Sequence, residues 1–411
     1  MENPMEKDGF MNDKPMGKHH LYSNSFEGQW EVLQVEFIGV LQILLRNLCL
    51  SIFFQRNYVK PTAYLTEFVT LTFPMLFCLT IFSEYLTNFV LCLVYLWGFL
   101  TVIQWYFDKP VYYIVRNTDY LTYFRTGMFI GTAIGIMAVD FNVWPERFVG
   151  ILKEFLLYFL NYKHSLIEYG EHWNFFFTLA FLKLFTMIFP YPKSVKVGLA
   201  LGLFYQMWLC YGLEKWILRF DRNSWNPIDA NREGIFSLFG YIFEYSVTLV
   251  IARFIDEVDG IFNPSIQSGI LCLVSGALCF LTQLLAMSIF GEPCRKIANI
   301  PYVFAMLSTK ILQVGCFQFM HVRDSERSKK QESKMLNLIE GISSNCLWYF
   351  LIANLGVLFI NLMINTRKID NIGLQMFILI GYNFVTISII YFWYLYKNKK
   401  SSSNSLPILK Y

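Results

Sequence analysis

The chain has 411 residues, of which 55% are hydrophobic and only 16% are charged, and its formal net charge is +4. Soluble globular domains carry about 25% charged residues, so a water-soluble enzyme of this length could not bury so much apolar surface. The mild charge and the lack of a basic stripe also argue against nucleic-acid binding. The composition therefore predicts an integral membrane protein.

The first residues of the chain are polar and contain no apolar run long enough for a signal peptide. We expect a polar N-terminal tail over residues 1–34. A multi-span transmembrane domain should follow over residues 35–396, and residues 397–411 should form a second polar tail.

Eleven apolar segments lie within the predicted transmembrane domain. Each approaches the length of about 20 residues that a membrane-spanning helix requires, whereas the strands of a barrel would be about half as long and would alternate in polarity. The fold class predicted is all-α, a polytopic transmembrane helical bundle with about 11 spans. The segments cover residues 36–54, 65–82, 86–106, 121–139, 174–190, 195–213, 235–252, 269–290, 300–320, 346–363 and 373–395.

Four strongly polar side chains interrupt these apolar segments: Arg46, Arg125, Asn354 and Asn361. Polar groups are unfavourable in lipid, so we expect these residues to face the bundle interior or a wet cavity. There Arg125 could hold a phosphate or line a substrate groove. It precedes Asp140 by about 22 Å along a continuous helix, too far for a direct pair.

The first of three polar clusters is "AVDFNVWPERF" at residues 138–148, where a predicted span ends. Asp140 is either an interfacial carboxylate solvated by headgroup water or a poorly solvated base that accepts a proton from a substrate hydroxyl. Arg147 is close enough in sequence to pair with it.

The second cluster is "EYGEHWNFFFT" at residues 168–178. His172 is suited to proton transfer near neutral pH, although a histidine beside Trp173 at a membrane boundary can equally be structural. Asn174 could cap the helix that follows.

The third cluster is "NPIDANREGIFSLFGY" at residues 226–241, before another apolar run. Asn231 suits a helix N-cap and Glu233 suits the first turn, so capping alone is one interpretation. Arg232 beside a helix N-terminus also suits an anion such as phosphate, and Gly234 would allow close approach. The alternation of spans places all three clusters on the same side of the membrane.

These clusters, taken in order, resemble the motifs of the inositol acyltransferases of GPI-anchor biosynthesis. The similar stretches are residues 138–148, 168–178, 228–241 and 354–366, with shorter likenesses at 66–75, 124–125 and 295–300. The succession of "EYGEHWNFFFT" and "DANREGIFSLFGY" is highly specific for that family.

The resemblance implies a multi-pass enzyme of the endoplasmic reticulum membrane. Such an enzyme moves a fatty acyl group, typically palmitoyl, from acyl-CoA to the inositol ring of glucosaminyl-phosphatidylinositol. Its partners would be these two substrates and membrane lipids, with no nucleic acid, no metal and no bound cofactor. Asp140 would be the catalytic base. The candidate substrate-binding residues are Arg125, Arg147, His172, Trp173, Asn174, Asn231, Arg232, Glu233 and Gly234.

The sequence departs from the family pattern after residue 150. Gly150 stands where the family has a catalytic Lys, Glu146 stands where it has an Arg, and roughly two of its about thirteen spans are missing. Lys153 or Arg147 could supply the lost positive charge. Three explanations follow: an overlooked coding segment, a reduced but active enzyme, or an inactive relative. A lipid or small-molecule transporter is the alternative from another functional class.

Overall fold

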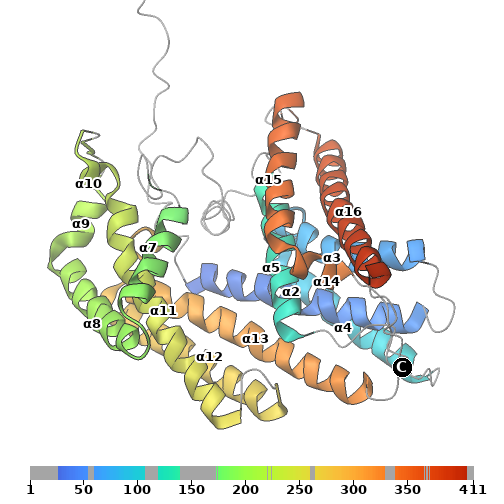
Figure 1. The fold of residues 1–411 in the computed structure, drawn as a ribbon, viewed down its shortest axis with the longest axis horizontal. Coiled ribbons are helices and arrows are strands. Elements are labelled where there is room, and N and C mark those ends of the chain that lie inside the picture. Colours follow the sequence, from blue (N-terminus) through green and yellow to red (C-terminus); the bar gives the residue numbers. More distant parts are fainter. Residues whose placement is uncertain are drawn as a thin grey trace, which may run out of the picture.

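The chain is described by a computed structural model whose described residues form helices joined by turns and loops, with no strand among them (Figure 1). These are residues 26–53, 60–106, 119–138, 173, 175–219, 221–223, 225–259, 264–328, 338–364, 366, 369 and 371–404. The predicted all-α fold class is thereby confirmed for this part of the chain.

All eleven predicted apolar segments coincide with helices. The longer helices are α2 (Phe26–Phe53), α3 (Lys60–Leu79), α4 (Leu86–Tyr106), α5 (Tyr120–Ala138), α7 (Phe175–Ile188), α8 (Lys193–Trp208), α11 (Arg232–Asp259), α12 (Ile266–Phe290), α13 (Ile300–Ser328), α15 (Cys346–Met363) and α16 (Ile372–Asn404). The shorter ones are η1 (Ser83–Tyr85), the π-helical segment η2 (Leu209–Leu213), α9 (Glu214–Ile217), α10 (Pro227–Ala230), η3 (Arg295–Ile297) and α14 (Leu338–Ser344).

Eight of the described helices are long and apolar enough to cross a membrane, fewer than the eleven spans predicted. The other three predicted segments are α5, α7 and α8 followed by η2. Helix α7 has 14 residues and α8 has 16 before the chain passes into the π-helical segment. The helical boundaries also differ from the predicted tails, because α2 already begins at Phe26 and α16 continues to Asn404.

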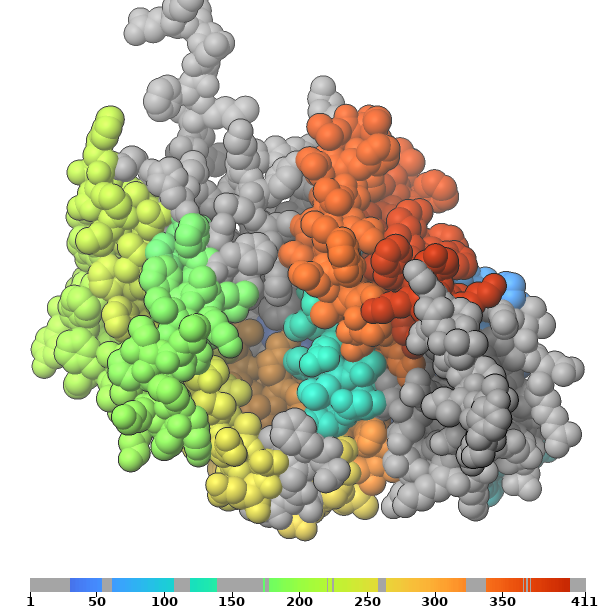
Figure 2. Space-filling view, viewed as in Figure 1, coloured from blue at the N-terminus to red at the C-terminus, as the bar shows by residue number. Residues whose placement is uncertain are grey.

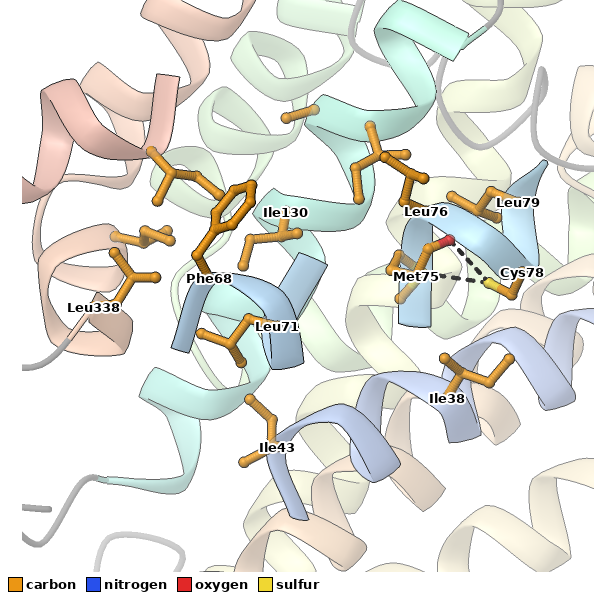
Figure 3. Packing of buried hydrophobic residues seen from close by; sticks show 14 of the residues in the cluster. Ile38, Ile43, Phe68, Leu71, Met75, Leu76, Cys78, Leu79, Ile130 and Leu338 are labelled. Atoms are coloured by element: carbon orange, nitrogen blue, oxygen red, sulfur yellow. Dashed lines mark hydrogen bonds between the residues drawn. The ribbon is translucent and has the colours of Figure 1, made fainter. Parts of the chain in front are cut away.

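The helices form two groups that both pack on α13. The terminal group comprises α2 to α5 and α14 to α16, and the central group comprises α7 to α12 with η3. Helix α13 packs on α11 and α12 on one side and on α2 and α5 on the other. The largest hydrophobic core lies within the terminal group, where Ile38, Leu71 and Ile130 are inaccessible to solvent (Figure 3).

A buried ion pair holds α2 to α3 inside the terminal group. The Nε of Arg46 donates to Glu67 Oε1 at 2.9 Å, and Glu67 Oε2 accepts from the backbone N–H of Leu338 at 3.1 Å. This confirms the interior position predicted for Arg46, which is fully buried. Arg125, by contrast, is exposed on α5, so the bundle interior does not enclose it, and the wet cavity expected as the alternative stays a prediction.

The two asparagines predicted to interrupt α15 each form a local hydrogen bond. Asn354 Nδ2 donates to the carbonyl of Phe350 at 2.7 Å, and Asn361 Oδ1 accepts from the Thr366 hydroxyl at 3.1 Å. Bonds of this kind return polar groups to the helix's own backbone or to its end, although Asn354 Oδ1 is buried without a hydrogen-bond partner.

Close packing of α8 on α11 depends on two glycines. A Cβ atom at Gly202 would lie 2.3 Å from the ring of Phe243, and one at Gly198 would lie 1.9 Å from Ser246 Oγ. Helices can approach closely in a membrane where small residues line the contact. The contact fixes α11 against α8 and so sets the position of the residues at the start of α11.

We predict that Gly202→Leu separates α8 from α11 and lowers the free energy of unfolding by about 1–3 kcal/mol, as overpacking of a core does. Unfolding followed in detergent measures the loss. Gly98→Leu is the matched control, since no atom lies within 4 Å of the Cβ position at Gly98 on α4. Equal stability of the two variants would contradict the close-packing interpretation.

Candidate functional site

The polar stretch before α11 is organised around the side chain of Arg232, which is fully buried. Its Nε donates to the carbonyl of Ile217 at 2.8 Å. Its Nη1 donates at 2.8 Å to both the carbonyl of Asp221 and Asp229 Oδ1. Its Nη2 donates to the carbonyl of Arg219, and the guanidinium lies 5.7 Å from the ring centre of Trp216.

This geometry gives Arg232 a structural role. Four of its five N–H donors are engaged by acceptors of the protein itself. A substrate phosphate would have to replace one of these bonds. The phosphate contact expected of Arg232 stays a prediction, and the contacts observed for Arg232 are structural ones within the turn.

Asp229 is the carboxylate at the centre of the same turn. It accepts hydrogen bonds from Arg232 at 2.8 Å, from Arg219 at 2.9 Å and from the backbone N–H of Asn223 at 2.7 Å. Burial raises the pKa of Asp229, but these three donors outweigh burial and lower the pKa from 3.8 to about 2. Asp229 is therefore ionised at physiological pH and neutralises the cations around it.

A second ion pair closes the turn onto α11. Arg222 pairs with Glu233 and also donates to the carbonyl of Ala230 at 2.6 Å. Glu233 is buried, as the first-turn carboxylate of a docked helix can be when a cation faces it. The side chain of Asn231 donates to the carbonyl of Pro227 at 3.0 Å, while its own carbonyl accepts the first hydrogen bond of α11 from Ile235. The side chain that caps this region is Asn226, which accepts from Ile228 at the start of α10.

Trp173 and Gly234 bring two of the predicted motifs into contact. A Cβ atom at Gly234 would lie 2.3 Å from the indole of Trp173, so only glycine allows the ring to lie there. The indole N–H donates to Thr178 Oγ1 at 3.1 Å, and the ring stacks on Phe181 at 5.5 Å. The space beside Gly234 is thus occupied by the indole of Trp173, a residue of the "EYGEHWNFFFT" motif, and the close approach of a headgroup at Gly234 stays a prediction.

The ends of α5 and α11 that carry the polar motifs lie at the same end of α13. Tyr120 and Tyr123 of α5 lie against His321 and Phe317 of α13, with ring centres 6.4 and 6.1 Å apart, so the two helices run antiparallel.

Helix α11 runs parallel to α13. The Cβ position of Gly240 lies 2.1 Å from the carbonyl of Ala298, just before α13, and Phe243 meets Phe304 with ring centres 6.3 Å apart. The end of α5, the start of α11 and Trp173 therefore all lie near the point where α13 begins.

Several predicted site residues lie outside the described residues. They are the base Asp140, Arg147, His172 and Asn174, together with Gly150. The described residues nearest in sequence to Asp140 and His172 are Ala138 and Trp173. Ala138, two residues before Asp140, is fully buried, and Trp173 directly follows His172. Arg125, also predicted to bind substrate, lies nearer the opposite end of α5.

The sequence analysis missed several ionisable side chains inside spans, among them Glu67 of α3, which pairs with Arg46. Lys310 of α13 donates to Glu36 of α2, and Glu244 lies in the middle of α11. A search for every acid or base within an apolar run would have found Lys310 and Glu244, because both interrupt long apolar stretches. Within the described residues no group of three or more His, Cys, Asp or Glu side chains could hold a metal ion.

The sequence matches the family model described as GWT1 over residues 18–151 and again over residues 147–393. A similar protein from Arabidopsis thaliana, described as uncharacterized, is 25% identical over 399 residues, with 83% of this chain and 88% of that protein aligned. GPI-anchored wall transfer protein 1 of Saccharomyces cerevisiae is 24% identical over 355 residues, covering 65% and 71%.

The human relative is named glucosaminyl-phosphatidylinositol-acyltransferase PIGW and is 24% identical over 294 residues, covering 62% of this chain and 58% of that protein. The chain therefore spans between somewhat more than half and about nine-tenths of the length of these relatives. In the yeast alignment, 355 positions use only 65% of the 411 residues here, so the yeast protein contains stretches with no counterpart in this chain.

We predict that Gly234→Ala displaces Trp173 and lowers the free energy of unfolding by about 1–3 kcal/mol, because the added methyl group overlaps the indole. The double variant Gly234→Ala/Trp173→Ala should recover much of that loss, with a coupling energy of about 0.5–3 kcal/mol between the two positions. Gly381→Ala on α16, where no atom lies within 4 Å of the Cβ position, is the control. Additive effects would show that the two residues are not in contact.

Asp229 gives a prediction about acid stability. Its folded-state pKa is lowered, so its contribution is complete above its ordinary pKa of 3.8 and is lost as the pH falls towards about 2. We expect the wild type to lose more stability than Asp229→Asn between about pH 4 and pH 2. Unfolding in detergent at several pH values measures the difference, and parallel curves would contradict the role assigned to Asp229.

Proposed function

The chain belongs to the GWT1 family, and on that basis we propose that it transfers a fatty acyl group to the inositol ring of glucosaminyl-phosphatidylinositol in GPI-anchor biosynthesis. The observation that carries the proposal is the contact of Trp173 with Gly234, which joins the two most specific motifs at one end of the helical bundle. The relatives' names, an acyltransferase acting on glucosaminyl-phosphatidylinositol among them, support the same activity.

The acyl donor in this proposal is acyl-CoA, with palmitoyl-CoA as the preferred form. The inositol hydroxyl oxygen attacks the thioester carbonyl carbon, an ester bond forms, the carbon–sulfur bond breaks, and the thiol of coenzyme A leaves. Asp140 accepts the hydroxyl proton as the oxygen attacks and returns it to the departing thiolate, which thereby leaves as the thiol. This direct transfer needs both substrates held together, and it needs hydrogen-bond donors or a cation near the developing oxyanion.

Some of the remaining candidate substrate-binding residues have observed contacts near the start of α11, and others are proposed from their motifs alone. Trp173 and Gly234 lie in contact at the start of α11, and Asn231 and Glu233 hold the turn that leads into it. Arg219 offers an alternative to Arg232 as an anion contact, since its side chain is 43% exposed while Asp229 and Trp216 hold it in place. His172, Asn174 and Arg147 stay as predicted headgroup contacts on the strength of their motifs alone.

The missing internal segment has support from the comparisons. The two parts of the family match meet at residues 147–151, next to Gly150, where the sequence departs from the family pattern. A break in the match at this point fits the absence of a segment that the family model contains. It leaves open a shortened active enzyme and an inactive relative.

The chain is a multi-pass membrane protein, with eight candidate spans among its described residues. We propose the endoplasmic reticulum membrane as its location, since the relatives' names connect them with GPI-anchored proteins and with a GPI intermediate. Acyl-CoA and the glycolipid would then meet at the end of the bundle where α13 begins.

We predict that the purified chain acylates glucosaminyl-phosphatidylinositol with palmitoyl-CoA, and that Asp140→Asn lowers kcat by at least about 100-fold, the usual contribution of a general base. Mass spectrometry of the lipid product measures the transfer. Asp119→Asn, a matched change at the exposed start of α5, should keep the wild-type rate.

Three results would contradict parts of this proposal. A wild-type rate in Asp140→Asn would remove the assignment of the base. Acylation by the family enzyme with the missing segment, but not by this chain, would indicate an inactive relative. Lipid movement across vesicles that is independent of coenzyme A would favour the transporter.

A further inference from the structure

Glu244 is an acidic side chain in the middle of a membrane span. It lies near the centre of the span Arg232–Glu257 and is half-buried. Within the described residues no side chain forms a hydrogen bond or an ion pair with its carboxylate, and the Thr248 hydroxyl donates only to its backbone carbonyl, at 2.7 Å. An ionisable group at this depth is strongly unfavourable in lipid, so such groups face a cavity or a ligand and are commonly functional.

The geometry of α11 determines which way Glu244 faces. Gly240 meets Ala298 beside the start of α13, and Gly234 meets Trp173 in front of α7. At 3.6 residues per turn, Glu244 lies between these two directions, on the side away from α8, which Ser246 contacts. Glu244 therefore faces the space between α13 and α7.

A hollow opens on that side of the molecule. Figure 2 shows it between α7 on one side and α5 and α15 on the other, with α13 at its floor. Helices α7 and α13, which border this hollow, are the two elements between which Glu244 points.

The nearest described ion pair on α13 joins Lys310 to Glu36 and does not include Glu244. Lys310 of α13 donates to Glu36 of α2, and both side chains keep partial exposure, 23% and 16%. Their opposite charges largely offset each other. The carboxylate of Glu244 has no such partner among the described residues, so the hollow suits a ligand that carries a positive charge.

Contacts with α13 allow the heights of Glu244 and of the end of α5 to be compared along the bundle. Counting back from the contact of Tyr123 with Phe317, the end of α5 is level with the first turn of α13. Counting from the contact of Phe243 with Phe304, Glu244 is level with nearly the same part of α13. Glu244 and the end of α5, two residues before Asp140, therefore lie within about one helical turn, ~5 Å, in height.

We propose that Glu244 binds the ammonium group of the glucosaminyl sugar and so selects the free amine over its acetylated form. This inference rests on the proposed function. The ammonium has three N–H donors and a positive charge, which a carboxylate pairs with directly, whereas N-acetylation removes the charge and leaves one N–H. The hydroxyl to be acylated belongs to the neighbouring inositol ring, so Glu244 holds one ring while the base acts on the other.

The test measures lipid binding by the full chain in nanodiscs, independently of turnover. Thermal stabilisation is titrated with glucosaminyl-phosphatidylinositol and with its N-acetyl form, for the wild type, Glu244→Gln and Glu244→Asp. Glu257→Gln, an exposed carboxylate near the other end of α11, is the matched control.

We expect the wild type and Glu257→Gln to bind the free amine about 10-fold or more tightly than the acetylated lipid, the worth of one hydrogen bond to a charged group. In Glu244→Gln this preference should fall to about twofold or less, through weaker binding of the amine lipid alone, and Glu244→Asp should keep part of it. A wild-type preference that survives in Glu244→Gln overturns the proposal, as does a wild type that binds both lipids equally.

If Glu244→Gln does not fold, the same titration is made with Glu244→Asp, and the wild type is titrated with a glucosyl lipid that has a hydroxyl in place of the amine. Equal binding of the glucosyl and glucosaminyl lipids by the wild type overturns the proposal. Acyl transfer is measured separately on the same samples. Selective binding without transfer would defeat the proposed function and leave this inference standing, whereas transfer that does not depend on Glu244 would do the reverse.

Discussion

A guanidinium taken out of water must find acceptors for its hydrogens, and at Arg232 this requirement organises the start of α11. The acceptors are carbonyls of Ile217, Arg219 and Asp221 and the carboxylate of Asp229. Leaving such a group unpaired would be strongly destabilising, so the chain from α9 to α11 can fold only in ways that wrap around it. Gly234, two residues further on, is thereby brought to Trp173, and two distant motifs become one structure.

The shared helix α13 extends this local order to the whole bundle. Helix α5 runs against it and α11 runs along it, which brings the end of one and the start of the other to the same height. The polar residues of the sequence are thus collected at one end, while the ion pair between Arg46 and Glu67 lies in the interior of the terminal group, holding α2 to α3. Charge at the end of the bundle and charge in its interior have different functions: the first surrounds a candidate site and the second joins helices.

The sequence predicted where the helices lie, but it did not predict where they are distorted or which groups their polar side chains contact. Apolar length identifies a helix in lipid because a spanning segment has no other way to satisfy its backbone. It did not identify the π-helical segment, where Gly212 has a φ of 111° and the axis turns. For Arg232 the pattern beside a helix start suggested an anion site. Besides the carboxylate of Asp229, its acceptors are backbone carbonyls 11 to 15 residues earlier, and no side-chain pattern in the sequence predicts those carbonyls. Glu244 was visible in the sequence as an acid in an apolar run, but its direction depends on which neighbours cover the other faces of α11.

The arrangement of two helix groups on one shared helix has a consequence for how a lipid arrives. Among the described helices only α13 packs broadly on both groups, so α13 is the helix that joins them. A two-tailed glycolipid that enters from the bilayer between the two groups would keep its tails in the lipid, and only its sugar would have to leave it. The contacts that border the space between the groups are therefore distinct from those that hold each core together.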